Sequence, residues 1–181
     1  MNLTNQLLVA TPDMQDSRFT QAVILICEHN EHGALGININ VPSEVTFDEI
    51  LKSLDIDAAE KPLPHAIYEG GPVNTQCGFI LHQSEPIFDS TIQIAKEIHL
   101  TTSKDIIKAI AADQIDGNWL MALGCATWDS GQLEQEIAEH DWLITPSQNE
   151  LVFDHEHNKW HMALALMGIK PHQLSGDIGH A

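Results

Sequence analysis

The sequence predicts an α+β fold in which a mixed, strongly bent sheet is flanked by helices. Strand patterns dominate the first half of the chain, and short strands alternate with helical patterns in the second half. Two early strands are separated by a short turn, so they should form a hairpin, and a purely parallel sheet is not expected. No Gly/Ser/Pro-rich linker or internal repeat divides the sequence, and residues 1–181 are expected to form one domain.

The strand assignments depend on apolar runs that are bounded by turn residues. Residues 22–27 are continuously apolar and rich in β-branched side chains, as in a strand buried on both faces. Residues 29–33 are expected to form the turn that follows this run, and Gly70-Gly71-Pro72 is expected to end a later strand. Strands are expected over residues 7–11, 22–27, 34–40, 66–69, 78–82, 119–123, 142–145 and 151–153.

The helix assignments depend on capping signals. Thr46 and Glu49 have the spacing of a capping box, in which each side chain binds the backbone N–H of the other residue. Asp129 or Ser130 is expected to cap a helix that begins at Gly131. Helices are expected from Thr46 to about Leu54, from Thr102 or Ser103 to Ala112, over residues 131–140, and over residues 157–167 before Gly168.

The charge balance is strongly acidic, with 26 Asp and Glu residues against 8 Lys and Arg residues and a formal net charge of −18. Phosphate backbones and anionic lipids are bound by clustered Lys and Arg, so neither direct nucleic-acid binding nor membrane association is expected. Solubility or adaptation to a salty habitat is one explanation of the charge. A basic protein partner is the other.

The cysteines indicate a reducing compartment. Cys27, Cys77 and Cys125 are widely spaced and odd in number, so no disulfide framework is expected. Cys27 should be shielded within its apolar strand, and Cys125 should be partly accessible. The N-terminal residues lack the basic start and apolar run of a signal peptide, and no apolar stretch has the length of a membrane helix. The expected location is the cytoplasm.

Four local patterns together resemble one known family. The first runs from Cys27 to Gly36 and on to Asn40-Val41-Pro42, and the second from Tyr68 to Val73, followed by Leu81-His82. The third runs from Leu123 to Glu134, with Glu136 and Trp142 after it. The last comprises Trp160, Gly168, Leu174-Ser175 and the terminal Gly179-His180-Ala181. In this order and spacing the chain resembles the bacterial YqgE/AlgH family over nearly its whole length.

The resemblance implies a single-domain α/β sandwich with a mixed, bifurcated sheet curled into a pseudo-barrel and with flanking helices. The family carries a label of transcriptional regulator and has no established biochemical activity. Two departures concern candidate positions. Val41 stands where the family usually has a cation, and Cys125 and Thr127 stand where it usually has tyrosine and glycine.

Two motifs are candidates for ligand or partner contact. Gly70-Gly71-Pro72-Val73 follows a strand, where glycines let a ligand or another backbone approach closely. The sequence favours the alternative, a structural turn, because no Lys follows and the pattern is not a phosphate-binding motif. The segment from Trp128 to Glu134 leads from a strand into a helix and could line a cleft. In the alternative interpretation Trp128 is a core residue, and Gln132 and Glu134 bind local loop backbone.

Catalytic and metal-binding patterns are incomplete in this sequence. Cys27 and His29, two residues apart on a strand, should point to one face, and a catalytic dyad is conceivable. Ser130 lacks the nucleophile-elbow context. The 11 histidines include close pairs but no zinc-binding pattern. No metal and no cofactor are expected.

These observations favour a non-enzymatic binding or regulatory protein that uses a shallow cleft framed by residues 28–36, 70–73 and 128–134, because sites commonly lie at strand ends and turns. Its partner would be an unknown protein or small molecule. The alternative is a small-molecule enzyme, such as a hydrolase, that uses carboxylate, His or Cys groups in that cleft. The candidate binding residues are Glu28, His29, Asn30, Gly33, Asn40, Gly70, Gly71, Pro72, Val73, His82, Trp128, Gly131, Gln132 and Glu134.

Overall fold

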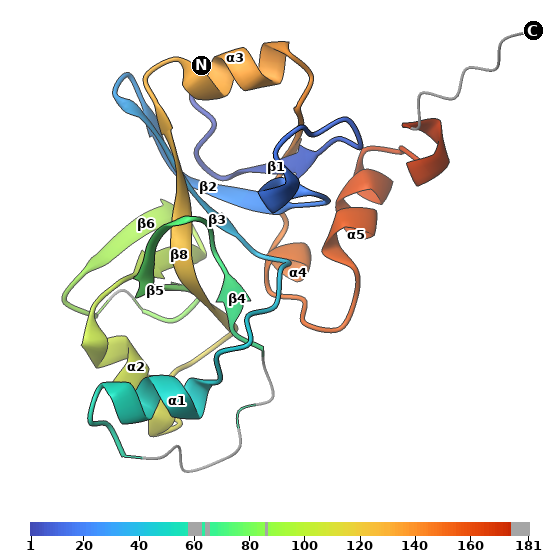
Figure 1. Ribbon diagram of the computed structural model, residues 1–181. Coiled ribbons are helices and arrows are strands. Elements are labelled where there is room, and N and C mark those ends of the chain that lie inside the picture. Colours follow the sequence, from blue (N-terminus) through green and yellow to red (C-terminus); the bar gives the residue numbers. More distant parts are fainter. Residues whose placement is uncertain (58–62, 64–65, 86, 175–181) are drawn as a thin grey trace, which may run out of the picture.

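A computed structural model describes residues 1–57, 63, 66–85 and 87–174, and it contains a curled sheet with helices on both of its faces (Figure 1). Its strands follow the order β6-β7-β5-β8-β3-β2-β1-β9, and β4 pairs with β8 outside this path. The strands are β1 (Gln6–Ala10), β2 (Val23–Asn30), β3 (Gly33–Asn38), β4 (Tyr68–Glu69), β5 (Val73–His82), β6 (Thr91–Ala95), β7 (Ile98–Thr101), β8 (Trp119–Asp129) and β9 (Trp142–Pro146).

The helices in the described residues are short, and none of them is long and apolar enough to cross a bilayer. They are α1 (Phe47–Ser53), α2 (Lys104–Ala111), α3 (Gln132–Ala138), α4 (Asn149–Val152) and α5 (Lys159–Leu166), with 3₁₀ turns η1 (Ser17–Phe19) and η2 (Pro171–Gln173).

Strand β8 belongs to both halves of the sheet and is the point at which the sheet divides (Figure 1). Its C-terminal part pairs with β3, from Ala126 to Asp129, and its N-terminal part pairs with β4 and β5. The change occurs at Gly124, whose φ of 77° bends the strand. Opposite this bend β5 has a bulge, because the register passes from Val73↔Cys125 to Gly78↔Leu123. The sheet therefore curls into a half-barrel.

Three apolar clusters follow from this curvature. One fills the concave side of the sheet and includes residues of α4 and α5, among them Leu151 and Trp160. A second packs α3, through Leu133, against strands β1, β2 and β9. The third packs α1 and α2 against β5 and the N-terminal part of β8. The expected α+β fold with a mixed, bifurcated sheet and flanking helices is confirmed, because β4 and β8 run parallel and the other strand pairs are antiparallel.

Most local predictions are confirmed, and their reasons are visible. Thr46 accepts a hydrogen bond from the Glu49 amide, and the Glu49 carboxylate accepts one from the Thr46 amide, as a capping box requires. Strands β2 and β3 form the expected antiparallel hairpin. Ser103 occupies the N-cap position of α2, although its side chain makes no capping bond.

Three local predictions are wrong or incomplete. Residues 151–153 do not form a strand, because Leu151 and Val152 lie in α4. Three apolar residues are too few to distinguish the two-residue period of a strand from the 3.6-residue period of a helix. Gly131, with φ 78°, is the N-cap of α3 in place of Asp129 or Ser130. The predictions omitted β6 and β7, in which polar side chains such as Gln93 and His99 interrupt the apolar pattern. The terminal Ser175 and Gly179-His180-Ala181 of the family pattern lie outside the described residues.

Candidate functional site

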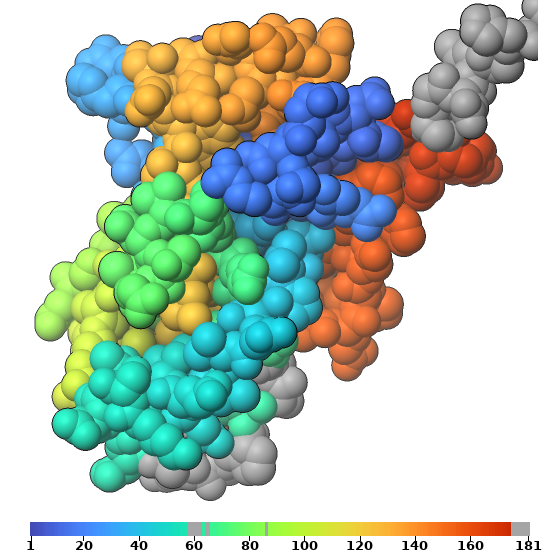
Figure 2. All heavy atoms as spheres, in the orientation of Figure 1, coloured from blue at the N-terminus to red at the C-terminus, as the bar shows by residue number. Residues whose placement is uncertain are grey.

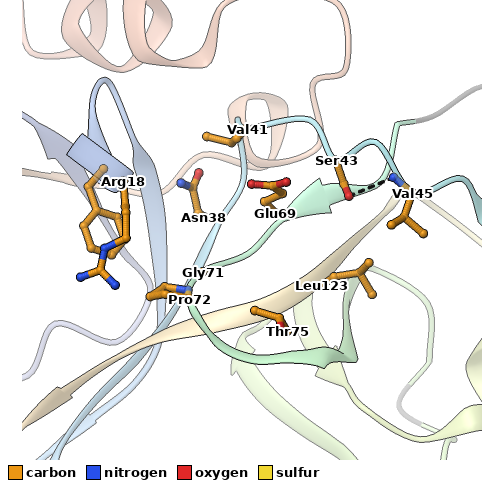
Figure 3. Close-up of a pocket in the computed structure, with 11 residues that line it drawn as sticks. Arg18, Asn38, Val41, Ser43, Val45, Glu69, Gly71, Pro72, Thr75 and Leu123 are labelled. Carbon is orange, nitrogen blue, oxygen red and sulfur yellow. Dashed lines mark hydrogen bonds between the residues drawn. The ribbon is translucent and has the colours of Figure 1, made fainter. Parts of the chain in front are cut away.

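A groove crosses the molecule beside the dividing point of the sheet, and we call it the central groove. Its first compartment has a volume of about 380 Å³ and lies between η1, the segment after β3, and the β4–β5 turn. Figure 3 shows side chains from these separate segments facing one space. The lining residues are Arg18, Phe19, Asn38, Val41, Ser43, Val45, Glu69, Gly71, Pro72, Thr75 and Leu123.

The second compartment has a volume of about 430 Å³ and lies between α1, α2 and β5. It shares Val45, Thr75 and Leu123 with the first compartment, so the two are continuous. In Figure 2 a hollow separates the green residues around position 75 from the cyan residues around position 45, and β8 is visible at its floor. The second compartment adds the apolar side chains of Ile50, Leu54, Ile107 and Met121, together with polar ones such as Gln76 and Lys104.

The groove exists because two glycines bring the β4–β5 turn onto β8. The Gly70 amide donates to the Leu123 carbonyl, and the Gly70 carbonyl accepts from the Asn38 amide. A Cβ on Gly71 would overlap the carbonyl group of Cys125 and the Ala126 nitrogen, so only glycine fits this backbone approach. After Pro72 the chain bulges outward over residues 74–77, which have no opposite residue in the β5–β8 register. The turn and the bulge together form one wall of the groove.

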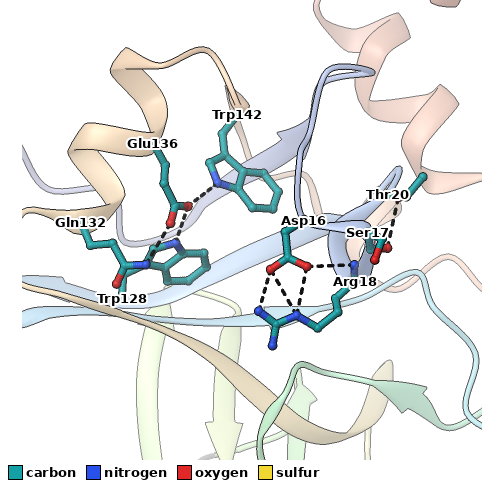
Figure 4. A network of polar contacts seen from close by, with 8 residues as sticks. All are labelled: Asp16, Ser17, Arg18, Thr20, Trp128, Gln132, Glu136 and Trp142. Atoms are coloured by element: carbon teal, nitrogen blue, oxygen red, sulfur yellow. Dashed lines mark hydrogen bonds and ion pairs between the residues drawn. The ribbon is translucent and has the colours of Figure 1, made fainter.

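Few polar groups lie in the first compartment, and most already have partners. Arg18 binds Asp16 through two nitrogens, the shorter contact being 2.6 Å between Nη2 and Oδ2 (Figure 4). This guanidinium is the main cause that lowers the pKa of Asp16. Asn38 is buried and its side-chain oxygen accepts from the Asn40 amide at 3.2 Å. Glu69 is exposed and its carboxylate lies between Val41 and Ser43 in Figure 3.

The three segments predicted to frame one cleft do not line one cleft. Among them only Gly71 and Pro72 line the central groove. Gly70 is buried by its backbone bonds, and Val73 is paired with Cys125 at the wall. The other two segments meet at the opposite end of β8. There Glu28, Asn30, Gly33 and Trp128 line a separate, shallow hollow of about 210 Å³.

Trp128 and Gln132 take the structural roles that the sequence left open as alternatives. Trp128 is buried, and its Nε1 donates to Glu136 Oε2 at 2.9 Å. Trp142 donates to the same oxygen at 2.9 Å, so one carboxylate holds two indoles (Figure 4). Gln132 accepts from the Asp129 amide and donates to Glu136 Oε1. Phe19 of the groove packs edge-on against Trp142, with ring centroids 5.7 Å apart.

Glu136→Ala is expected to lower the free energy of unfolding by about 2–3 kcal/mol, because two partly buried indole N–H groups lose their acceptor. Glu136→Gln should recover part of this loss, since an amide oxygen still accepts. Glu139→Ala on the same helix, which removes one exposed bond from Gln135, is the matched control and should cost less than about 0.5 kcal/mol. Urea unfolding followed by tryptophan fluorescence measures all three; equal losses for Glu136→Ala and Glu139→Ala would contradict the assignment.

The expected shared face of Cys27 and His29 is wrong, and the reason is a bulge in β2. The register shifts between Ile26↔Gly36 and Glu28↔Leu35, so Cys27 is an extra residue. Cys27 packs in the concave core, whereas His29 contacts Leu3 and α3 on the other face. Burial raises the pKa of the Cys27 thiol, and a catalytic dyad is not formed.

His29 is instead held between two partners. Its Nδ1 accepts the Leu3 amide at 3.0 Å, so the proton of the neutral ring is on Nε2, which donates to Glu134 Oε1 at 3.0 Å. A histidine and a carboxylate therefore do converge, but backbone occupies the ring nitrogen that a general base would use. The His29 side chain is only 2% exposed. This pair ties the N-terminal segment and β2 to α3.

The remaining candidates are placed by local structure. Asn40 accepts the Val23 amide and donates to the Gln21 carbonyl, which closes the start of β2. A Cβ on Gly33 would overlap the Trp128 carbonyl. His82 is fully buried and bonded to Thr101 at 2.7 Å and Ser84 at 2.8 Å. Burial lowers the pKa of His82 to about 4, so this ring is neutral in the core.

The cysteines differ from prediction in one respect. Cys125 is buried, not partly accessible, because Gly71 and Val73 cover it. The exposed thiol is that of Cys77, which lines the second compartment. Cys27 is shielded, as expected. No group of three or more His, Cys, Asp or Glu side chains that could hold a metal ion occurs in the described part of the chain.

Most residues of the central groove were not predicted from the sequence. Glu69 could have been singled out from the sequence, because it is an acidic residue directly before the Gly-Gly-Pro turn. Arg18, Ser43 and Thr75 come from three segments that are adjacent only after folding, and no sequence pattern relates them.

Comparisons with known proteins agree with this architecture. A family model described as AlgH-like matches residues 7–172. A UPF0301 protein of Vibrio cholerae is 42% identical over 187 residues, which cover 100% of both chains. The solution structure of the AlgH protein from Pseudomonas aeruginosa has a TM-score of 0.80 and 38% identity, covering 100% of this chain and 97% of that one. A crystal structure from Corynebacterium diphtheriae has a TM-score of 0.74 and 25% identity, covering 96% and 91%.

Proposed function

This chain belongs to the AlgH-like family, and we propose that it is a non-enzymatic binding or regulatory protein that acts through the central groove. One observation carries the proposal. Two apolar compartments join into a continuous groove whose wall and floor are fixed by backbone contacts of Gly70, Gly71 and Gly124. Ligand sites in proteins are commonly preformed, mainly apolar concavities with a few oriented polar groups.

The side chains that could serve catalysis support binding more than they support an enzyme. Cys27 and Cys125 are buried, and burial raises the pKa of both thiols. One ring nitrogen of His29 accepts the Leu3 amide, and the residue lies outside the groove. Glu28 belongs to the shallow hollow at the other end of β8. Apart from the His29–Glu134 pair, the groups named for a hydrolase are thus distributed among separate places.

Blocking the groove is expected to abolish binding of a small apolar probe. The probe is prodan, a neutral naphthalene dye whose emission shifts when water is excluded from it. Thr75 is exposed and lines both compartments, so Thr75→Trp should fill the passage between them. We expect the dissociation constant of prodan to rise at least about tenfold, which corresponds to about 1.4 kcal/mol.

Thr127→Trp is the matched control, because Thr127 is an exposed threonine on β8 that lines neither compartment. Its dissociation constant for prodan should stay within about twofold of the parent's value. The proposal fails if the parent does not bind prodan or if the two tryptophan variants weaken binding equally.

A further inference from the structure

We infer that the occupant of the central groove is a basic segment of a partner protein, with a Lys or Arg side chain of that segment paired to Glu69. This inference rests on the proposed function and specifies the partner's chemistry. Glu69 is exposed and lines the first compartment among Val41, Val45 and Leu123. No ion pair or hydrogen bond of its side chain occurs within the described residues.

Of the two charged side chains in the first compartment, Arg18 and Glu69, only Glu69 has no charged partner among the described residues. Arg18 is neutralised by its bidentate contact with Asp16. Lys104 donates to the Leu54 carbonyl, which satisfies one of its protons inside the second compartment. Glu49 accepts the Thr46 amide at 2.8 Å as part of its capping box. In the first compartment a cationic group would therefore meet an unpaired carboxylate, whereas an anionic group would have to compete with Asp16 for Arg18.

The surroundings of Glu69 strengthen its attraction for a cation in two ways. A segment bound along the apolar walls would exclude water from Glu69, so an ion pair formed beneath that segment is stronger than one on open surface. The formal net charge of −18 also draws cations toward the whole molecule. The aliphatic part of a Lys or Arg side chain fits against Val41 and Val45 while its charged head reaches Glu69.

The shape of the groove favours a peptide segment over an isolated cation. The two compartments are joined at Thr75 and Leu123, so neighbouring side chains of an extended chain can enter both. Along an extended chain, side chains on one face recur every ~6.6 Å. Residues 74–77 of the wall are exposed and have no partner in the β5–β8 register. The main chain of a bound segment can therefore run beside them.

Selection from a displayed random heptapeptide library tests this inference, with the full chain immobilised at about 300 mM salt to suppress long-range attraction. The parent should select peptides in which a Lys or Arg stands beside apolar residues. Glu69→Gln should lose the enrichment of Lys and Arg by at least about tenfold. Glu31→Gln removes an acid from the β2–β3 turn whose side chain is 86% exposed, and it should keep the enrichment.

Amide chemical shifts locate the selected peptides. A synthetic peptide of the most frequent sequence should shift the resonances of Val45 and Leu123 in the parent but not in Thr75→Trp. Two outcomes would overturn the inference and leave the proposed function intact. In the first, the peptides that bind the groove contain no basic residues. In the second, Glu69→Gln selects Lys and Arg as strongly as the parent does. No selected peptide, together with groove shifts on adding n-hexylamine, would also overturn it in favour of small amines. Peptides that map elsewhere, with no prodan binding, would remove both.

Discussion

Gly71→Ala is expected to lower the free energy of unfolding by at least about 4 kcal/mol, because a steric clash with backbone atoms adds to the strain of an unfavourable φ angle. Gly71 has a φ of 151°, which residues with a Cβ rarely adopt. The added methyl group would overlap the carbonyl group of Cys125 and the amide nitrogen of Ala126. These are backbone atoms of the central strand β8, which pairs with both halves of the sheet. Neither the β4–β5 turn nor β8 can therefore move away without separating the two halves.

Gly131→Ala is the matched control for this prediction. Gly131 also has a positive φ, 78°, but a Cβ there would have no other atom within 4 Å. Its substitution should cost only the backbone term of about 1–2 kcal/mol. Thermal and urea unfolding of the parent and both variants give the comparison. If Gly71→Ala costs no more than Gly131→Ala, the close approach of the β4–β5 turn to β8 is not required for stability.

Much of the fold is predictable from the sequence because its signals are local. The capping box at Thr46, the apolar run in β2 and the two glycines before Pro72 each describe a short segment and are confirmed by it. The mixed character of the sheet follows from the early hairpin and the later helices. The resemblance to the YqgE/AlgH family supplied the bifurcated, curled sheet, which no local pattern indicates.

The candidate site was less predictable because its geometry depends on irregularities and on long-range contacts. A single extra residue in β2 places Cys27 and His29 on opposite faces, and a bulge of this kind has no sequence signature. Trp128 and Glu136 belong to the motif that the sequence singled out, but only the folded structure shows that Trp142 shares the Glu136 carboxylate with Trp128. The groove joins Arg18 to Glu69 and Leu123 across about a hundred residues of chain, a span that periodicity cannot relate.

Lys159 is the clearest residue that the sequence did not indicate. It is a lysine within an apolar helix, only 3% exposed, and its amine donates to the carbonyl oxygens of Ile39 at 2.9 Å and Val152 at 2.8 Å. The Tyr68 ring lies 5.0 Å from the same nitrogen. The amine thus joins α5 and α4 to the segment after β3. Burial lowers the pKa of Lys159 to about 7, and the charge of Asp154 opposes that shift only partly.

Replacing Lys159 with methionine is expected to cost about 3–4 kcal/mol at pH 8, because two buried carbonyls lose their donor while the aliphatic packing is kept. The cost should depend on pH. In the unfolded chain Lys159 keeps its proton up to about pH 10.5, whereas in the folded protein it loses the proton near pH 7. Between these values the unfolded state binds more protons, so the parent gains stability as the pH rises.

Lys159→Met has no such titration, and the difference in unfolding free energy between parent and variant should widen by about 2 kcal/mol from pH 7 to pH 9, since one pH unit corresponds to at most about 1.4 kcal/mol. Urea titrations of both proteins at several pH values measure this difference, in which contributions from other groups cancel. Lys96→Met is the matched control, because Lys96 is exposed in the β6–β7 turn, and its difference from the parent should stay constant. A constant difference for Lys159→Met as well would mean that the buried amine keeps its proton throughout this range, held by the two carbonyls and the Tyr68 ring.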